Sequence, residues 1–158
     1  MRGYMRTRTI LLTLLACFMG AVVALAADAN VGTWKLNSAK SKFTPGTPKN
    51  DTVIIEVAGD NMKITVDGTD GDSKPAHNMW TGKFDGKDYA VTGDPASDMR
   101  SYTAVNDHTW TLAQKKGGKV TATGRIVVSP DGKSRTVTIT GTDPQGKKVA
   151  STAVYNKQ

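Results

Sequence analysis

The chain has 158 residues and a formal net charge of +7, a length that suits one domain and is short for two. Residues 27–158 hold 18 Thr, 12 Val and 5 Ile, against 2 Leu and a single Glu. Helices are built mainly from Ala, Leu, Glu, Lys and Gln, whereas β-branched residues suit a pleated, half-buried surface. The composition therefore excludes a helical bundle and a helical repeat array, and a hydrophobic content of 38% excludes a disordered chain.

The first 26 residues have the pattern of an export signal. Three arginines and no acid open the chain, and an apolar run covers Ile10–Ala24. Ala24-Leu25-Ala26 then supplies a small-x-small cleavage site. We predict a signal peptide at residues 1–26 and one exported domain at residues 27–158, located in the periplasm or outside the cell. An uncleaved anchor is an alternative, but the run is short for a bilayer span of about 20 residues.

Cys17 leaves another interpretation of the export signal open. Leu14-Leu15-Ala16-Cys17 resembles a bacterial lipoprotein signal, so the protein would be anchored through Cys17 in that case. Apolar residues continue well past Cys17, which favours the later cut after Ala26. With that cut the domain contains no cysteine, which excludes disulfides, thiol nucleophiles and thiolate metal sites.

The mature part of the chain is mildly basic, with 18 Lys and Arg against 14 Asp and Glu. This balance suits solubility and weak attraction to anionic surfaces, and it is too small to indicate a nucleic-acid partner. We therefore expect no nucleic-acid partner. We also expect no stable membrane insertion of the mature chain, and a monomer.

Short turns rich in Gly, Asp, Asn and Pro recur along the mature chain, and apolar residues alternate between them. Threonines occupy the opposite positions, a pattern typical of an antiparallel sheet that is wet on one side. Ten strands are predicted at residues 33–36, 52–58, 62–67, 75–82, 88–91, 98–105, 108–115, 119–129, 133–142 and 147–156. The one long connection, residues 37–50, has room for a helical turn at Ser38–Lys42.

Sequential hairpins leave two end strands with unpaired backbone, and closing the sheet on itself removes both edges. We predict an all-β protein, an antiparallel up-and-down meander barrel of 8–10 strands. A β-sandwich is the alternative.

The first predicted strand carries Gly32-Thr33-Trp34, a Gly-x-Trp sequence. Followed by an antiparallel meander, it resembles the calycin superfamily of lipocalins and fatty-acid-binding proteins, and most of all the small exported lipocalin-like proteins of bacteria. The resemblance implies a barrel closed at one end by Gly32 and Trp34, with a cavity for a small apolar molecule. It also implies a late-strand arginine packed over Trp34, for which Arg125 and Arg135 are candidates. The lipocalin Thr-Asp-Tyr motif and the helical lid of fatty-acid-binding proteins have no counterpart here.

Trp80 and Trp110 fit core positions better than site positions. If the barrel is hollow, one of them is expected to line the cavity, and both are therefore the candidate ligand contacts, because aromatic faces bind apolar ligands well. The inward positions are otherwise small or β-branched, which favours a cavity, although methionines and tryptophans can fill a narrow one.

No catalytic residue, cofactor or metal site is predicted. The chain has two histidines, one glutamate and no Gly-x-Ser-x-Gly sequence, so neither a metal site nor a nucleophile has support. We predict an exported, non-enzymatic binding protein for a small apolar or amphipathic ligand. The alternative is a ligand-free envelope or surface interaction module with a packed barrel or sandwich.

Overall fold

The computed structural model describes residues 28–143 and 145–158. The predicted signal peptide at residues 1–26, including Cys17, lies outside the described residues. Within the described ranges, no helix has the length and apolar character needed to cross a membrane.

The described residues form one sheet and a single short 3-10 helix, η1, at Ser38–Lys40. The strands are β1 (Gly32–Leu36), β2 (Lys42–Phe43), β3 (Lys49–Ala58), β4 (Asn61–Thr69), β5 (Pro75–Gly82), β6 (Tyr89–Thr92), β7 (Met99–Asn106), β8 (Thr109–Lys116), β9 (Lys119–Val128), β10 (Ser134–Thr142) and β11 (Lys148–Lys157). All ten predicted strands are present, and β2 has no counterpart among them. The expected helical turn lies where the sequence indicates, as η1.

The sheet closes on itself. The strand order is β1-β3-β4-β5-β6-β7-β8-β9-β10-β11, and β11 pairs back with β1. The closing register places Trp34 opposite Lys157 and Leu36 opposite Tyr155. The predicted antiparallel meander barrel is therefore confirmed, with ten strands in the ring and β2 as a short addition on β11.

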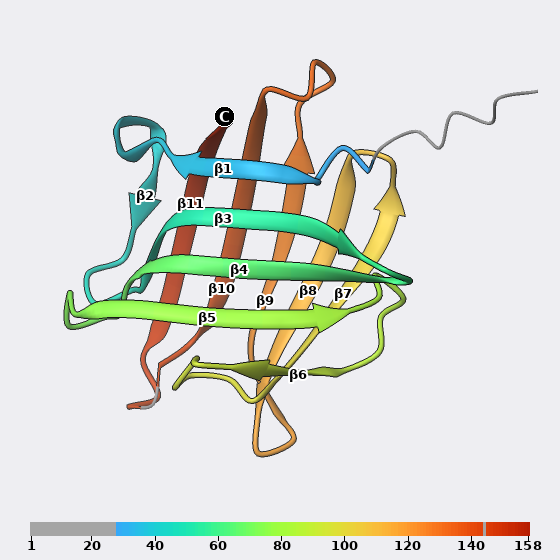
Figure 1. The fold of residues 1–158 in the computed structure, drawn as a ribbon. Coiled ribbons are helices and arrows are strands. Elements are labelled where there is room, and N and C mark those ends of the chain that lie inside the picture. Colours follow the sequence, from blue (N-terminus) through green and yellow to red (C-terminus); the bar gives the residue numbers. More distant parts are fainter. Residues whose placement is uncertain (1–27, 144) are drawn as a thin grey trace, which may run out of the picture.

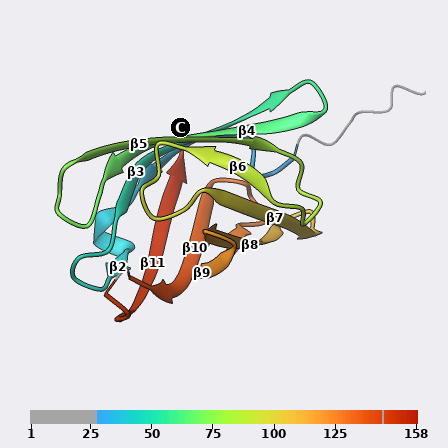
Figure 2. The same cartoon turned by 90° about the horizontal axis from the view of Figure 1, so that it is seen from below.

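The barrel is flattened into two layers that cross each other. β1, β3, β4 and β5 form one layer, and β7 to β11 run across them in the other (Figure 1). Figure 2 shows the same two layers from below, with β6 beside β5 and β7. Every strand of the second layer therefore has one face toward the core and one toward solvent.

Aromatic side chains fill the interior between the layers. All eight aromatic residues of residues 28–158 are buried or pack against the buried core. The three tryptophans retain at most 2% of their exposed surface. A side chain that lined a void large enough for water would keep accessible surface, so the core around the tryptophans is filled. The composition favours a cavity because aromatic residues are few. The structure nevertheless directs all of them toward the core, and they fill the space that the composition leaves open.

Trp34 is completely buried on β1, opposite Lys157 of β11, and its role in closing one end of the barrel with Gly32 stays a prediction. Its indole Nε1 donates a hydrogen bond to the Asn30 carbonyl oxygen at 2.8 Å. The Arg135 guanidinium lies 5.9 Å from the Trp34 ring centroid, and the Lys157 ammonium lies 5.1 Å from it. Gly32 makes room for Lys157, because a Cβ at Gly32 would lie 2.5 Å from the Lys157 Cε. Of the two candidate arginines, Arg135 therefore packs over Trp34.

Candidate functional site: a threonine groove on the outer wall

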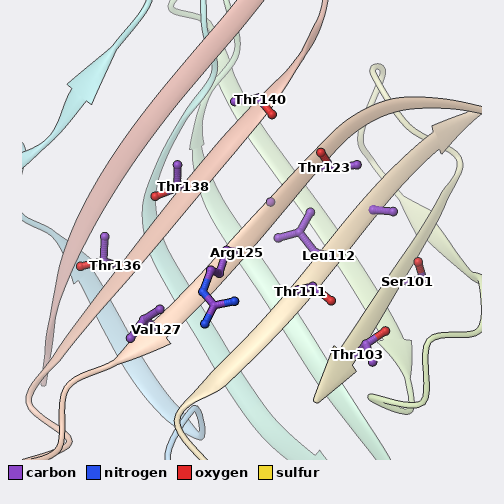
Figure 3. A pocket seen from close by; sticks show the side chains of 12 residues that line it. Ser101, Thr103, Thr111, Leu112, Thr123, Arg125, Val127, Thr136, Thr138 and Thr140 are labelled. Atoms are coloured by element: carbon purple, nitrogen blue, oxygen red, sulfur yellow. The ribbon is translucent and has the colours of Figure 1, made fainter. Parts of the chain in front are cut away.

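A shallow hollow of about 630 Å³ lies across β7, β8, β9 and β10. We call it the threonine groove. Its lining consists mainly of short hydroxyl-bearing and aliphatic side chains, together with one arginine (Figure 3). The lining residues are Ser101, Thr103, Thr111, Leu112, Ala113, Thr123, Gly124, Arg125, Val127, Thr136, Thr138 and Thr140.

The threonine groove is on the outside of the barrel. Side chains along a strand alternate between the two faces of a sheet. Ile126 and Val137 are buried in the core, so their neighbours Arg125 and Thr138 face outward, and both are exposed. Ten of the twelve lining residues occupy such outward positions; Leu112 and Gly124 are the inward ones. The groove is therefore separated from the filled interior by the sheet itself.

The hollow shape follows from strand geometry. Strands twist and coil, and a β-bulge increases the twist locally. The β7–β8 pairing shifts register between Ala104 and Asn106, and the β8–β9 pairing shifts between Gln114 and Lys115. These two irregularities flank the grooved part of the sheet. A twisted sheet with short threonines on its outer face leaves a concave surface that larger side chains would fill.

Arg125 is at the centre of the groove and carries the only formal charge among its lining residues. In register, Arg125 lies opposite Thr111 on β8 and Thr138 on β10. The groove thus presents one guanidinium with hydroxyl groups on either side.

The hydroxyl groups of the groove are available to a ligand. Within the described residues, threonine hydroxyls that form intramolecular hydrogen bonds belong to residues outside the groove lining: Thr44, Thr52, Thr92 and Thr121. A hydroxyl both donates and accepts hydrogen bonds, and the threonine methyl adds an apolar contact. The lining can therefore hold a molecule that has both polar and apolar parts.

A second hollow of about 280 Å³ lies on the opposite layer, over β4, β5 and β6. Lys63 and Met79 contribute to its lining. Both are outward-facing, because their neighbours Ile64 and Trp80 are buried. This second hollow is smaller than the threonine groove, and three of its six lining residues, Thr81, Tyr89 and Thr92, carry hydroxyl groups.

The predicted ligand contacts Trp80 and Trp110 lie in the interior. Trp80 is 1% exposed, and its Nε1 donates to the Arg100 carbonyl oxygen at 2.9 Å. Phe84 stacks on Trp80 with ring centroids 6.0 Å apart and reaches Trp110 at 6.4 Å. The structure thus brings both tryptophans into one aromatic cluster, and their role as ligand contacts stays a prediction.

Two further arginines are buried. The Arg100 guanidinium pairs with the Asp94 carboxylate at 2.8 Å. Arg135 has no such acid among the described ion pairs; it stacks between the rings of Trp34 and Tyr155. Burial lowers the pKa of Arg135, and burial raises the pKa of Tyr155 to about 12. Both groups therefore belong to the buried core beside Trp34 rather than to an accessible site.

The described residues contain no group of three or more His, Cys, Asp or Glu side chains placed to hold a metal ion. His77, one of the two histidines, pairs with exposed Asp67 at 2.6 Å.

The sequence predicts the outward threonines but not the groove that they line. The resemblance to lipocalins makes Arg125 only a candidate partner of Trp34, although the alternation of side chains along the strands already separates Arg125 from Arg135. Arg135 shares the face of Val137, whereas Arg125 alternates with Ile126. The signal for an outward arginine among threonines is therefore in the sequence, although the depth of the groove is not.

No protein-family model matches the sequence, and no curated protein does. Among solved structures, the redesigned β-barrel mFAP1 bound to DFHBI has 17% identity and a TM-score of 0.46, covering 84% of this chain and 98% of that chain. EF1p2_mFAP2b bound to DFHBI has 13% identity and a TM-score of 0.46, covering 84% of this chain and 97% of that chain. At these TM-scores the likeness says nothing about what this protein binds, and the fold assignment rests on its own strand pairing.

Proposed function

We propose that this protein is an exported, non-enzymatic binding protein for a small amphipathic molecule, and that the threonine groove is its binding site. The observation that carries the proposal is the groove itself: a hollow of about 630 Å³ lined by free hydroxyls, methyl groups and one arginine. Pockets that bind small molecules have volumes of about 300–1,000 Å³.

The filled interior supports a site on the outer wall. A ligand inside the barrel would have to displace side chains of the aromatic cluster, and removing a buried aromatic costs about 3–5 kcal/mol. A ligand in the threonine groove displaces only solvent. The outer site therefore needs no rearrangement of the core.

Titration of the mature protein with a fluorescent lipid-like probe, together with native mass spectrometry, tests the proposal. Thr138→Trp would fill the groove with an indole and should weaken probe binding at least tenfold. Thr65→Trp is the matched control, because Thr65 faces outward on β4, in the other layer. Equal binding by both variants and the wild type would place the probe elsewhere and refute the groove as the site.

A ligand-free interaction module is the second candidate function, and the filled interior favours it. Such a module would show no uptake of any small probe by the wild-type protein. It would instead bind another macromolecule through an outer face of the barrel, and Thr138→Trp would weaken that association only if the threonine groove were the interface.

Export is part of the proposal, supported by the arginines, apolar run and small-x-small site of residues 1–26. Mass analysis of the protein recovered from expressing bacteria tests it. A mature chain that begins at Ala27 supports cleavage after Ala26. A lipidated chain that begins at Cys17 would support the lipoprotein alternative, and an intact chain that begins at Met1 would contradict export with cleavage.

A further inference from the structure

We propose that the ligand of the threonine groove carries an oxyanion, such as a carboxylate, sulfonate or phosphate, and that Arg125 binds it. This inference rests on the proposed function and adds the chemistry of the ligand's polar group. Residues 28–158 contain three arginines, and the guanidinium of each lies in a different environment.

Arg100 and Arg135 each have a partner inside the protein. Arg100 is 5% exposed and bonds to Asp94. Arg135 is 4% exposed and stacks on two aromatic rings. Arg125 is exposed, and the ion pairs between charged side chains of the described residues engage other cations: Lys63, Lys74, Arg100 and Lys115. Arg135 also lacks an acidic partner among these ion pairs, but its guanidinium is buried against the rings of Trp34 and Tyr155. Arg125 is therefore the one of the three arginines that is both exposed to solvent and without an acidic partner among the described ion pairs.

The sequence around Arg125 contains no acid that would compete with a ligand. Between Met99 and Thr142 the only acidic residues are Asp107 and Asp131. Asp107 lies in the turn between β7 and β8, and Asp131 lies in the turn between β9 and β10. The Asp131 side chain already accepts hydrogen bonds from Ser129 and from the Lys133 backbone. The groove thus has a positive centre without a negative side chain among its lining residues.

The positions beside Arg125 suit an oxyanion. Neighbouring strands lie about 4.8 Å apart, so the backbones of Thr111 and Thr138 flank that of Arg125 at about that spacing, and all three side chains leave the same face of the sheet. A guanidinium donates two parallel hydrogen bonds to a carboxylate or phosphate, and hydroxyl groups can donate to the remaining oxygens. Three donors from three strands can therefore converge on one anionic group.

The rest of the groove suits the apolar part of the same ligand. Val127 is 39% exposed, although it is a large hydrophobic residue, and it is the next outward position after Arg125 on β9. Ala113 lies opposite Thr123, on the other side of Arg125 along the strands, so apolar surface flanks the arginine in both directions. A ligand with an anionic head and a flat apolar body would contact both parts at once.

A matched pair of fluorescent probes tests the inference. 1-Anilinonaphthalene-8-sulfonate carries a sulfonate, and N-phenyl-1-naphthylamine has the same ring system without it. The wild-type mature protein should bind the sulfonate probe more tightly than the neutral probe, because Arg125 can donate charge-assisted hydrogen bonds to the sulfonate. Solvent partly screens these bonds at the surface, so we expect a difference of about five- to tenfold in affinity. Arg125→Gln should remove this preference and leave the affinity for the neutral probe unchanged. Lys133→Gln, which removes an exposed cation from a turn outside the groove lining, should change neither affinity.

Two further measurements separate the inference from the function on which it rests. Raising the salt concentration from about 0.05 M to 0.5 M should weaken binding of the sulfonate probe alone, because salt screens exposed charges. If Arg125→Gln alters neither probe while Thr138→Trp blocks both, the oxyanion inference is overturned and the groove remains the site. If Thr138→Trp alters neither probe, the proposed function falls and the inference falls with it.

Discussion

The two faces of β8, β9 and β10 differ in every property that matters for function. On the inner face, Trp110 and Ile126 are almost completely buried. On the outer face of the same strands, Thr111 and Arg125 line a hollow that is open to solvent. One stretch of alternating sequence therefore encodes stability on one face of the sheet and a candidate binding surface on the other. The two roles should therefore be separable by mutating adjacent residues.

The largest expected effect comes from the inner face. Trp110→Ala should lower the free energy of unfolding by about 4 kcal/mol, because it leaves a large cavity in the filled core. Thr111→Ala, one residue further along β8, should lower it by less than about 1 kcal/mol, since surface substitutions have small effects. Urea unfolding of both variants measures the difference. Similar losses for the two variants would contradict the division of roles between the faces.

The buried Arg100 and the exposed Arg125 should also differ in how much each contributes to stability. Asp94→Ala should cost about 3 kcal/mol, because it leaves the Arg100 guanidinium buried without its carboxylate. Arg125→Gln should change stability by no more than about 0.5 kcal/mol, because Arg125 is exposed. Thermal or denaturant unfolding at neutral pH gives both values. A loss for Arg125→Gln as large as that for Asp94→Ala would mean that Arg125 supports the fold rather than a ligand.

Alkaline pH affects the inner face through Tyr155. Its pKa is raised from about 10 to about 12, so the folded protein holds the phenolic proton more tightly than the unfolded chain does. This contribution to stability is fully present below pH 10, and it is lost as the pH rises from about 10 to about 12. The wild type should lose about 2 kcal/mol more than Tyr155→Phe over that range. Parallel curves of stability against pH for the two proteins would contradict the burial of this hydroxyl.

The sequence predicts much of the fold because alternation and turn chemistry are local. Val53 and Ile55 share a face in the sequence pattern and are both buried in the barrel. The end strands of the meander would have unpaired backbone groups unless the sheet closed, and the pairing of β1 with β11 closes it. β2 is absent from the predicted elements because two residues, Lys42 and Phe43, are too few to show any alternation.

The interior and the site were harder to predict because both depend on three-dimensional shape. The small number of aromatic residues favours an interior lined by small side chains, with room for a cavity. Whether a cavity exists depends instead on where the aromatic residues are placed. Phe84 lies outside every predicted strand, yet its ring stacks on Trp80 and helps to fill the core. Likewise, the outward direction of Thr138 follows from alternation, whereas the groove around it depends on the twist and bulges of four strands.

The most direct test of the account is an NMR titration of the ¹⁵N-labelled mature protein with 1-anilinonaphthalene-8-sulfonate. Amide signals of Thr111, Arg125 and Thr138 should shift with a single saturable affinity, while the indole signals of Trp80 and Trp110 stay in place. Shifts of those two indole signals, with the three groove amides unmoved, would put the ligand inside the barrel and contradict a binding site on the outer wall.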